Sequence, residues 1–130
     1  MNKKTLIDRL VRIRDLLHVE SRWTKGWLAR DAEGNDVSTN NPNAVCFCLS
    51  GAVTKTSPDG KTEVVETFLN SQLSSLDGLT IPDFNDDSDH ADVLAFLERC
   101  LSAANSMSEE EWQAWIEGIS EGEEQNQIDV

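Results

Sequence analysis

Apolar residues recur every three or four positions in four stretches of the chain, the spacing of helices that each bury one face. The first stretch predicts a helix over residues 5–19, with Thr5 as its N-cap. The others predict a helix that Thr62 caps, a helix over 89–104, and a last helix over 108–120 that a capping box at Ser108 begins. The apolar stripe of the first helix consists of Leu6, Leu10, Ile13 and Leu17.

The run NAVCFCLSGAV, residues 43–53, is apolar on every side and carries no charge. Asn41 suits an N-cap and Pro42 suits the first helical position, so we predict a helix over 42–54. A helix that is apolar all round is a buried one, which would put it at the centre of the fold. A buried strand is the alternative, because a short apolar run fits either element.

The remaining segments predict a small β element and loops. Glu33-Gly34-Asn35 indicates a turn between strands near 26–31 and 36–39, and residues 76–88 are expected to form a loop. The predicted fold is α+β and mainly α, with about five helices around the central helix 42–54 and one β-hairpin. One compact domain would span 1–120, followed by an acidic, disordered tail over 121–130.

Charge separates the two parts of the chain. The protein has 130 residues and a net charge of −13. Residues 1–50 carry 8 basic and 6 acidic side chains, whereas residues 51–130 carry 3 basic and 18 acidic ones. Such a negative field repels nucleic acid and anionic lipid and favours a basic protein partner, although acidity also serves solubility.

Compartment and membrane association follow from other features of composition. No stretch of about 18 apolar residues occurs, so we expect no membrane-spanning segment. The amphipathic start lacks a signal-peptide cleavage site, and the odd number of three cysteines fits reduced thiols. These features predict a cytoplasmic protein.

Three sets of residues are candidates for chemistry. Cys46 and Cys48 are best explained as packed core thiols, and too few soft ligands accompany them for zinc, so no metal or cofactor is expected. The alternative is a cysteine nucleophile, Cys46 or Cys48, with His90 as base and Asp86 or Asn85 as its orienting group. Trp23 and Trp27, with Arg22 and Lys25, could form a ligand-binding ledge, but packing of the hairpin onto the first helix explains them more simply.

Three motifs resemble those of a small family of unknown function met in tailed bacteriophages and some bacteria. They are RWTKGWLARDAEG, NAVCFCLSGA and FNDDSDHADVLAFLERC, and the resemblance covers about residues 5–104. The shared positions are Trp23, Gly26, Ala29 and Asp31; Ala44, Phe47, Cys48, Gly51 and Ala52; and Phe84, Asn85 and Asp86. Phe84 departs from the family's usual tryptophan. The resemblance implies a phage-related origin and no particular chemistry.

The leading functional hypothesis is a non-enzymatic accessory protein that mimics DNA charge. It would bind a basic, nucleic-acid-handling host protein, as anti-restriction or anti-CRISPR inhibitors do, without binding nucleic acid or membrane. The expected binding residues are Glu110, Glu117, Glu121, Asp83, Asp86, Asp87, Asp89, Trp112 and Trp115. They would form one acidic face if the last two helices packed antiparallel. The alternatives are the cysteine enzyme and an assembly protein that forms homodimers through Trp112 and Trp115.

Overall fold

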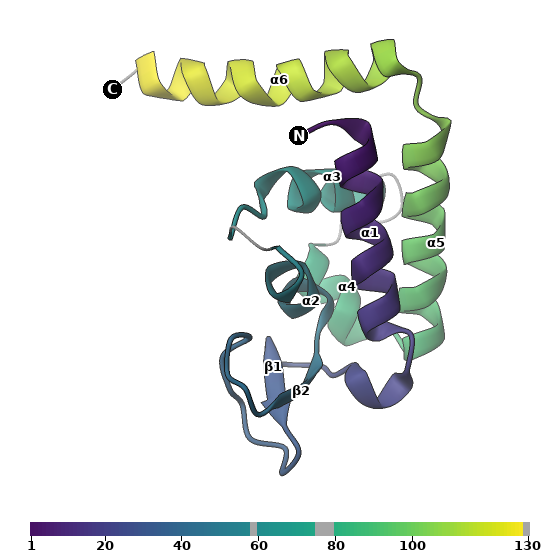
Figure 1. The fold of residues 1–130 in the computed structure, drawn as a ribbon, viewed down its shortest axis with the longest axis vertical. Helices are drawn as coiled ribbons and strands as arrows, with labels where there is room; N and C mark the ends of the chain where they lie inside the picture. Colours follow the sequence, from purple (N-terminus) through teal and green to yellow (C-terminus); the bar gives the residue numbers. More distant parts are fainter. Residues whose placement is uncertain (58–59, 75–79, 129–130) are drawn as a thin grey trace.

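The computed structural model (Figure 1) describes residues 1–57, 60–74 and 80–128, with side chains left out at residue 74 and from residue 120 onward. Within these ranges the fold is α+β and mainly α, as predicted. The helices are α1 Lys3–Leu17, η1 Glu20–Arg22 (a single 3-10 turn), α2 Leu49–Lys55, α3 Glu63–Ser74, α4 Ile81–Asp87, α5 His90–Ser106 and α6 Glu109–Ile128. The strands are β1 Ala29–Asp31 and β2 Ala44–Phe47.

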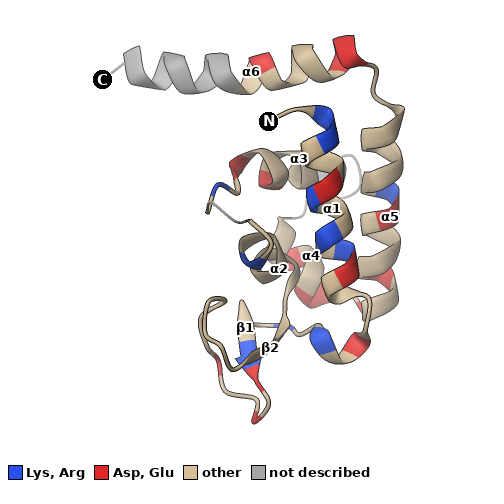
Figure 2. Ribbon diagram, in the orientation of Figure 1, with Lys and Arg blue, Asp and Glu red and all other residues tan. Residues whose placement is uncertain are grey.

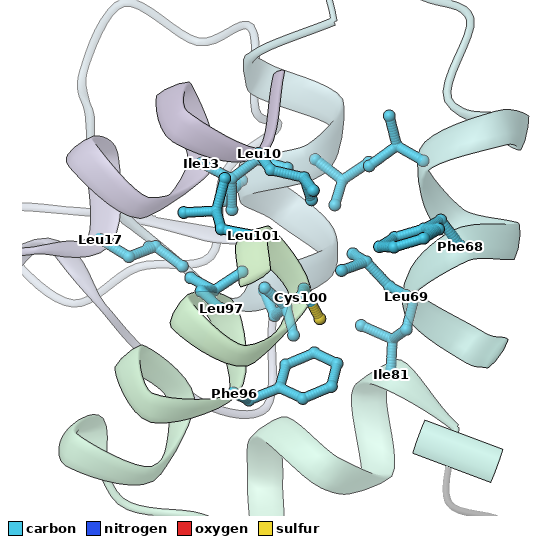
Figure 3. Close-up of a cluster of buried hydrophobic side chains, with 14 of the residues drawn as sticks. Leu10, Ile13, Leu17, Phe68, Leu69, Ile81, Phe96, Leu97, Cys100 and Leu101 are labelled. Atoms are coloured by element: carbon cyan, nitrogen blue, oxygen red, sulfur yellow. The ribbon is translucent and has the colours of Figure 1, made fainter. Parts of the chain in front are cut away.

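The core forms where α1 packs against α5. The two helices run antiparallel. The start of α1 lies at the end of α5, where Lys3 donates from Nζ to the carbonyl of Met107. The predicted stripe of α1 is fully buried. Figure 3 shows it meeting side chains of α3, α4 and α5, among them Phe68, Ile81 and Phe96. α1 begins two residues earlier than predicted, and Asn2 rather than Thr5 caps it.

The predicted central helix over 42–54 is wrong in its first half. Residues Ala44–Phe47 form strand β2, Cys48 is extended and caps the helix that follows, and α2 starts at Leu49. The apolar run is therefore two short elements joined at Cys48. A short apolar run fits either a helix or a strand, and here residues 44–47 form a strand because they pair with β1.

The hairpin also has a different partner strand from the one predicted. β1 pairs antiparallel with β2, with Ala29 opposite Phe47 and Arg30 opposite Cys46. Residues 36–39 contribute only an isolated bridge between Arg30 and Asp36. The turn at Gly34 is confirmed, with its φ of 85° in the region that glycine favours. The loop after that turn thus leads back to the apolar run, which supplies the strand.

The loop predicted over 76–88 contains a helix, α4; the first part of that loop, residues 76–79, lies outside the described residues. Thr80 caps it by accepting from the backbone N–H of Asp83, and Pro82 lies in the first turn. Proline there acts as a helix starter, since the first turn lacks acceptors for its N–H groups anyway. Pro82 therefore favours the start of this helix and does not interrupt it. α4 matters for function because it carries three of the predicted acidic residues.

The last helix crosses the end of the bundle. Ser108 and Glu111 form the predicted capping box, with Ser108 Oγ accepting from Glu111 N at 3.0 Å and Glu111 Oε1 accepting from Ser108 N at 2.9 Å. α6 then lies across the bundle end that holds the start of α1 and the end of α5 (Figure 1), so it does not pack antiparallel to α5. Its backbone continues to Ile128, beyond the predicted end at 120. The disordered tail remains a prediction, since those side chains and residues 129–130 lie outside the described part.

Candidate functional site

A buried asparagine on α4 is hydrogen-bonded to the segment before β1 and to the start of α2. Asn85 is 0% exposed. Its Oδ1 accepts from Trp23 Nε1 at 2.7 Å and from the backbone N–H of Leu49 at 3.0 Å, while its Nδ2 donates to the carbonyl of Thr24 at 3.1 Å. An amide has two donors and two acceptor positions, so this one is almost fully used by the fold. Asn85 thereby ties the segment before β1 to the start of α2.

The neighbouring carboxylate, Asp86, continues this hydrogen-bond network to the surface. Asp86 Oδ1 accepts from the backbone N–H of Gly26 at 3.0 Å and from Asn85 Nδ2 at 3.3 Å. Gly26 has a φ of 83°, a conformation that disfavours other residues. The Asp86 side chain is nevertheless exposed, so the same carboxylate fixes the loop and faces solvent.

The loop after Gly26 lies directly on α2. Leu28 accepts through its carbonyl from the backbone N–H of Cys48 at 3.2 Å. A Cβ added to Gly51 would come within 1.9 Å of that same carbonyl oxygen. Only glycine leaves room for this approach. All three sequence motifs thus meet at one junction between the hairpin, α2 and α4.

The candidate catalytic groups are engaged in separate contacts. Cys48 Sγ accepts from the backbone N–H of Gly51 at 3.3 Å, and burial, with a smaller contribution from the charge of Asp86, raises the pKa of its thiol. Nε2 of His90 donates to the carbonyl of Leu17 at 2.6 Å, and its ring lies 5.8 Å from that of Trp23. A raised pKa disfavours the thiolate that a nucleophile needs. Cys46 is half-buried, and its thiol points to the carbonyl of Arg30 at 3.9 Å.

The predicted acidic residues fall into two groups (Figure 2). One group, the corner carboxylates, consists of Asp83, Asp86 and Asp87 on α4 and Asp89, the cap of α5; all four are exposed. The other consists of Glu110 and Glu117 on α6, also exposed. α5 has 17 residues, so it separates the groups by about 25 Å. The side chain of Glu121 lies outside the described residues.

The four tryptophans have very different surroundings. Trp112 is 3% exposed and belongs to the domain's own core. Trp115 lies at a tilt against it, with ring centres 5.5 Å apart, and packs edge-on against Phe68. Trp23 is half-buried and contacts Asn85 on α4 and His90 on α5. Trp27 is 53% exposed. Sequence alone did not distinguish Trp23, which contacts Asn85 and His90, from the exposed Trp27.

The described residues contain no group of three or more His, Cys, Asp or Glu side chains arranged to hold a metal ion. Among the helices of that same part of the chain, none combines the length and apolar character that crossing a membrane requires.

Comparison with known proteins identifies the family. A family of unknown function, DUF6197, matches residues 1–103. The chain belongs to this family. No curated protein matches it, and no solved structure does.

The DUF6197 match covers most of the bundle and the whole hairpin–α4 junction. It includes the corner carboxylates and Trp27, and it stops just before the end of α5. Helix α6, with Glu110, Glu117 and both C-terminal tryptophans, lies beyond it. The expected resemblance to a family of unknown function over about residues 5–104 is confirmed in this form.

Proposed function

We propose that this protein is a non-enzymatic binding protein that occupies the nucleic-acid site of a basic host protein. The corner carboxylates make the contact, and the glutamates of α6 add to the long-range field. A phage or mobile-element origin, supported by the motif resemblance, would make it an inhibitor of host defence acting in the host cytoplasm.

The observation that carries this proposal is that the corner carboxylates are exposed and form no salt bridge with a described residue. Within the described ranges, the salt bridges are those of Arg14 with Asp15 and with Glu98, and none reaches Asp83, Asp86, Asp87 or Asp89. Their charges are therefore left for a partner to neutralise. A partner surface rich in arginine and lysine gains most from them, because each carboxylate meets a cation without first breaking an ion pair.

The spacing on α4 suits replacement of phosphates. Asp83 and Asp87 are four residues apart, a rise of about 6 Å along the helix. Phosphates of one DNA strand are about 3.4 Å apart along the axis, so every second phosphate is about 6.8 Å on. A basic groove that grips DNA could thus receive the exposed face of α4 with little change in the positions of its cations.

The two acidic groups should act differently at physiological salt. The screening length there is about 8 Å, much shorter than the roughly 25 Å along α5. A partner seated on the corner carboxylates would therefore sense Glu110 and Glu117 only weakly. They would speed the encounter more than they strengthen the complex.

The experiment compares two matched double variants, Asp83→Lys with Asp87→Lys and Glu110→Lys with Glu117→Lys. Each pair reverses two exposed charges, and each includes one acid from the first turn of a helix, so their effects on stability should be similar. Immobilised protein is exposed to a bacterial lysate at low and high salt, and each retained protein is purified and titrated with duplex DNA.

The proposal expects the retained protein to bind nucleic acid and to be displaced from this chain by DNA. The α4 double variant should bind that protein at least about tenfold more weakly than the α6 double variant does. A retained protein that binds DNA and this chain at the same time would contradict charge mimicry. Equal weakening by both double variants would contradict the corner carboxylates as the contact surface.

A further inference from the structure

We propose that Trp27 is the anchor of the partner-binding surface, and that it receives an arginine side chain of the basic partner. The guanidinium would stack on the indole ring while the carboxylates of α4 accept its hydrogen bonds. This inference rests on the proposed function and names the residue chemistry that the surface recognises.

The exposure of Trp27 is unusual for its residue type. Trp27 and Leu28 are consecutive and are 53% and 51% exposed, whereas the other three tryptophans are buried or half-buried. In the described part of the chain, no ring contact, cation–aromatic contact or hydrogen bond involves the Trp27 side chain. Large aromatic side chains left in water are typical of sites that another molecule covers.

The backbone on both sides of Trp27 is held in place. Before it, the N–H of Gly26 donates to Asp86 at 3.0 Å; after it, the carbonyl of Leu28 accepts from Cys48 at 3.2 Å and lies against Gly51. These contacts hold the backbone that carries the indole, while the ring itself still rotates about its side-chain bonds. The backbone entropy lost when a partner covers the ring is therefore small.

A carboxylate of α4 contacts the loop that carries Trp27, and the cations on either side of Trp27 in the sequence make contacts within the chain. Asp86 contacts the residue that precedes Trp27. Lys25 lies 5.5 Å from the ring centre of Trp23, and Arg30 donates to Thr24 Oγ1 and to the carbonyls of Lys25 and Gly34. The indole face and the α4 carboxylates are thus both open to a cation from another molecule.

Arginine fits this combination better than lysine or a second copy of the chain. Its planar guanidinium can stack on an aromatic ring and still donate to carboxylates in its plane, whereas an ammonium is a compact, strongly hydrated charge. A second copy would bring another net charge of −13 to an acidic surface. Trp27 and Leu28 alone also offer far less than the roughly 800 Å² that each partner of a stable interface buries.

The test uses hexa-arginine and hexa-lysine peptides, which carry equal charge, as probes of the full-length protein. The variants are Trp27→Leu, which keeps an apolar side chain but removes the aromatic ring, and Trp27→Phe, which restores a ring. The control is Val45→Ala, which shortens an exposed apolar side chain on β2. Binding is followed through the indole N–H signals of the tryptophans in NMR spectra and through calorimetric affinity.

We expect hexa-arginine to shift the Trp27 indole signal and leave that of buried Trp112 in place. Trp27→Leu should weaken hexa-arginine binding about two- to fivefold, with hexa-lysine almost unaffected, and Trp27→Phe should recover part of the loss. An unmoved Trp27 signal at saturating hexa-arginine, or equal losses for both peptides, would overturn the inference. If the Trp27 variants had no effect but Asp83→Lys with Asp87→Lys weakened peptide binding, the proposed function would stand without the Trp27 anchor. If neither the Trp27 variants nor this double variant changed binding, the inference and the proposed function would both fail.

Discussion

The indole Nε1 of Trp23 lies 2.7 Å from Oδ1 of Asn85, a residue 62 positions further along the chain. This hydrogen bond closes a junction in which a side chain before β1, the start of α2 and the middle of α4 share one buried amide. The exposed surface of Trp27 and the corner carboxylates is built on that junction. Its stability therefore determines whether the proposed binding surface exists.

Asn85→Ala should destabilise the protein by about 2–3 kcal/mol. The substitution leaves the half-buried indole N–H of Trp23 and the buried backbone N–H of Leu49 without their acceptor, and an unmet buried donor costs about 1–3 kcal/mol. Urea unfolding measures the change. The control is Asn105→Ala on α5, an exposed position whose amide bonds only to the carbonyl one turn earlier, where we expect a change within about 0.5 kcal/mol. Equal effects at both positions would argue against a stabilising role for the Asn85 hydrogen bonds.

Gly51→Ala and Gly118→Ala should change stability in opposite directions. At Gly51 the new Cβ would meet the Leu28 carbonyl at 1.9 Å, so α2 or the loop must shift, at a cost of about 1–3 kcal/mol. At Gly118, in α6, an added Cβ would meet no described atom within 4 Å apart from the helix's own backbone, so alanine should stabilise the helix by up to about 1 kcal/mol. Thermal unfolding of the two variants measures both changes. A neutral Gly51→Ala would mean that the Leu28 segment moves away freely.

The thiols should react in the order of their exposure. Cys46 is half-buried, whereas Cys48 and Cys100 are buried, and desolvation raises the pKa of Cys48 and raises that of Cys100 to about 12. We expect a bulky thiol reagent to label Cys46 first at pH 8, and the other two at a rate limited by unfolding. Mass spectrometry of digested samples follows each site. Rapid labelling of Cys48 in the native protein would contradict its burial and favour a reactive thiol at that position.

Stability should also fall at alkaline pH because of Cys100. Its ordinary pKa of 9.0 applies to the unfolded chain, and the native value is about 12. Above pH 9 the unfolded state therefore loses this proton while the native state keeps it. The free energy of unfolding should drop by up to about 1.4 kcal/mol per pH unit until pH 12. Cys100→Ala should show a smaller slope in urea titrations over this range, whatever its stability at pH 7; an unchanged slope would contradict the assignment.

Trp112→Ala should destabilise the folded monomer by about 3–5 kcal/mol. Trp112 is 3% exposed and packs against Trp115, so its removal leaves a cavity between α6 and the bundle. Gln113→Ala, on the exposed side of the same helix, is the control and should be nearly neutral. Melting curves at several protein concentrations distinguish this role from assembly. A melting temperature that rises with concentration in the native protein, but not in Trp112→Ala, would favour self-association through this helix.

The sequence by itself determined the long helices and their buried faces. The stripe from Leu6 to Leu17, the capping box at Ser108 and the mainly α class all follow from contacts three or four residues apart, which any single helix contains. Local pattern also separated the acidic part of the chain from the mixed part. These features need no knowledge of what lies beside each helix.

Only the tertiary structure decided the rest. Residues 44–47 form a strand because β1 pairs with them, and α6 crosses the end of α5 and so divides the predicted acidic face in two. Trp23 is held by Asn85 whereas Trp27 faces solvent, although both sit in the same short motif. Each of these outcomes depends on contacts between residues far apart in the chain. Such contacts leave no periodic signal in a single sequence, because their energy arises only once the whole chain has folded.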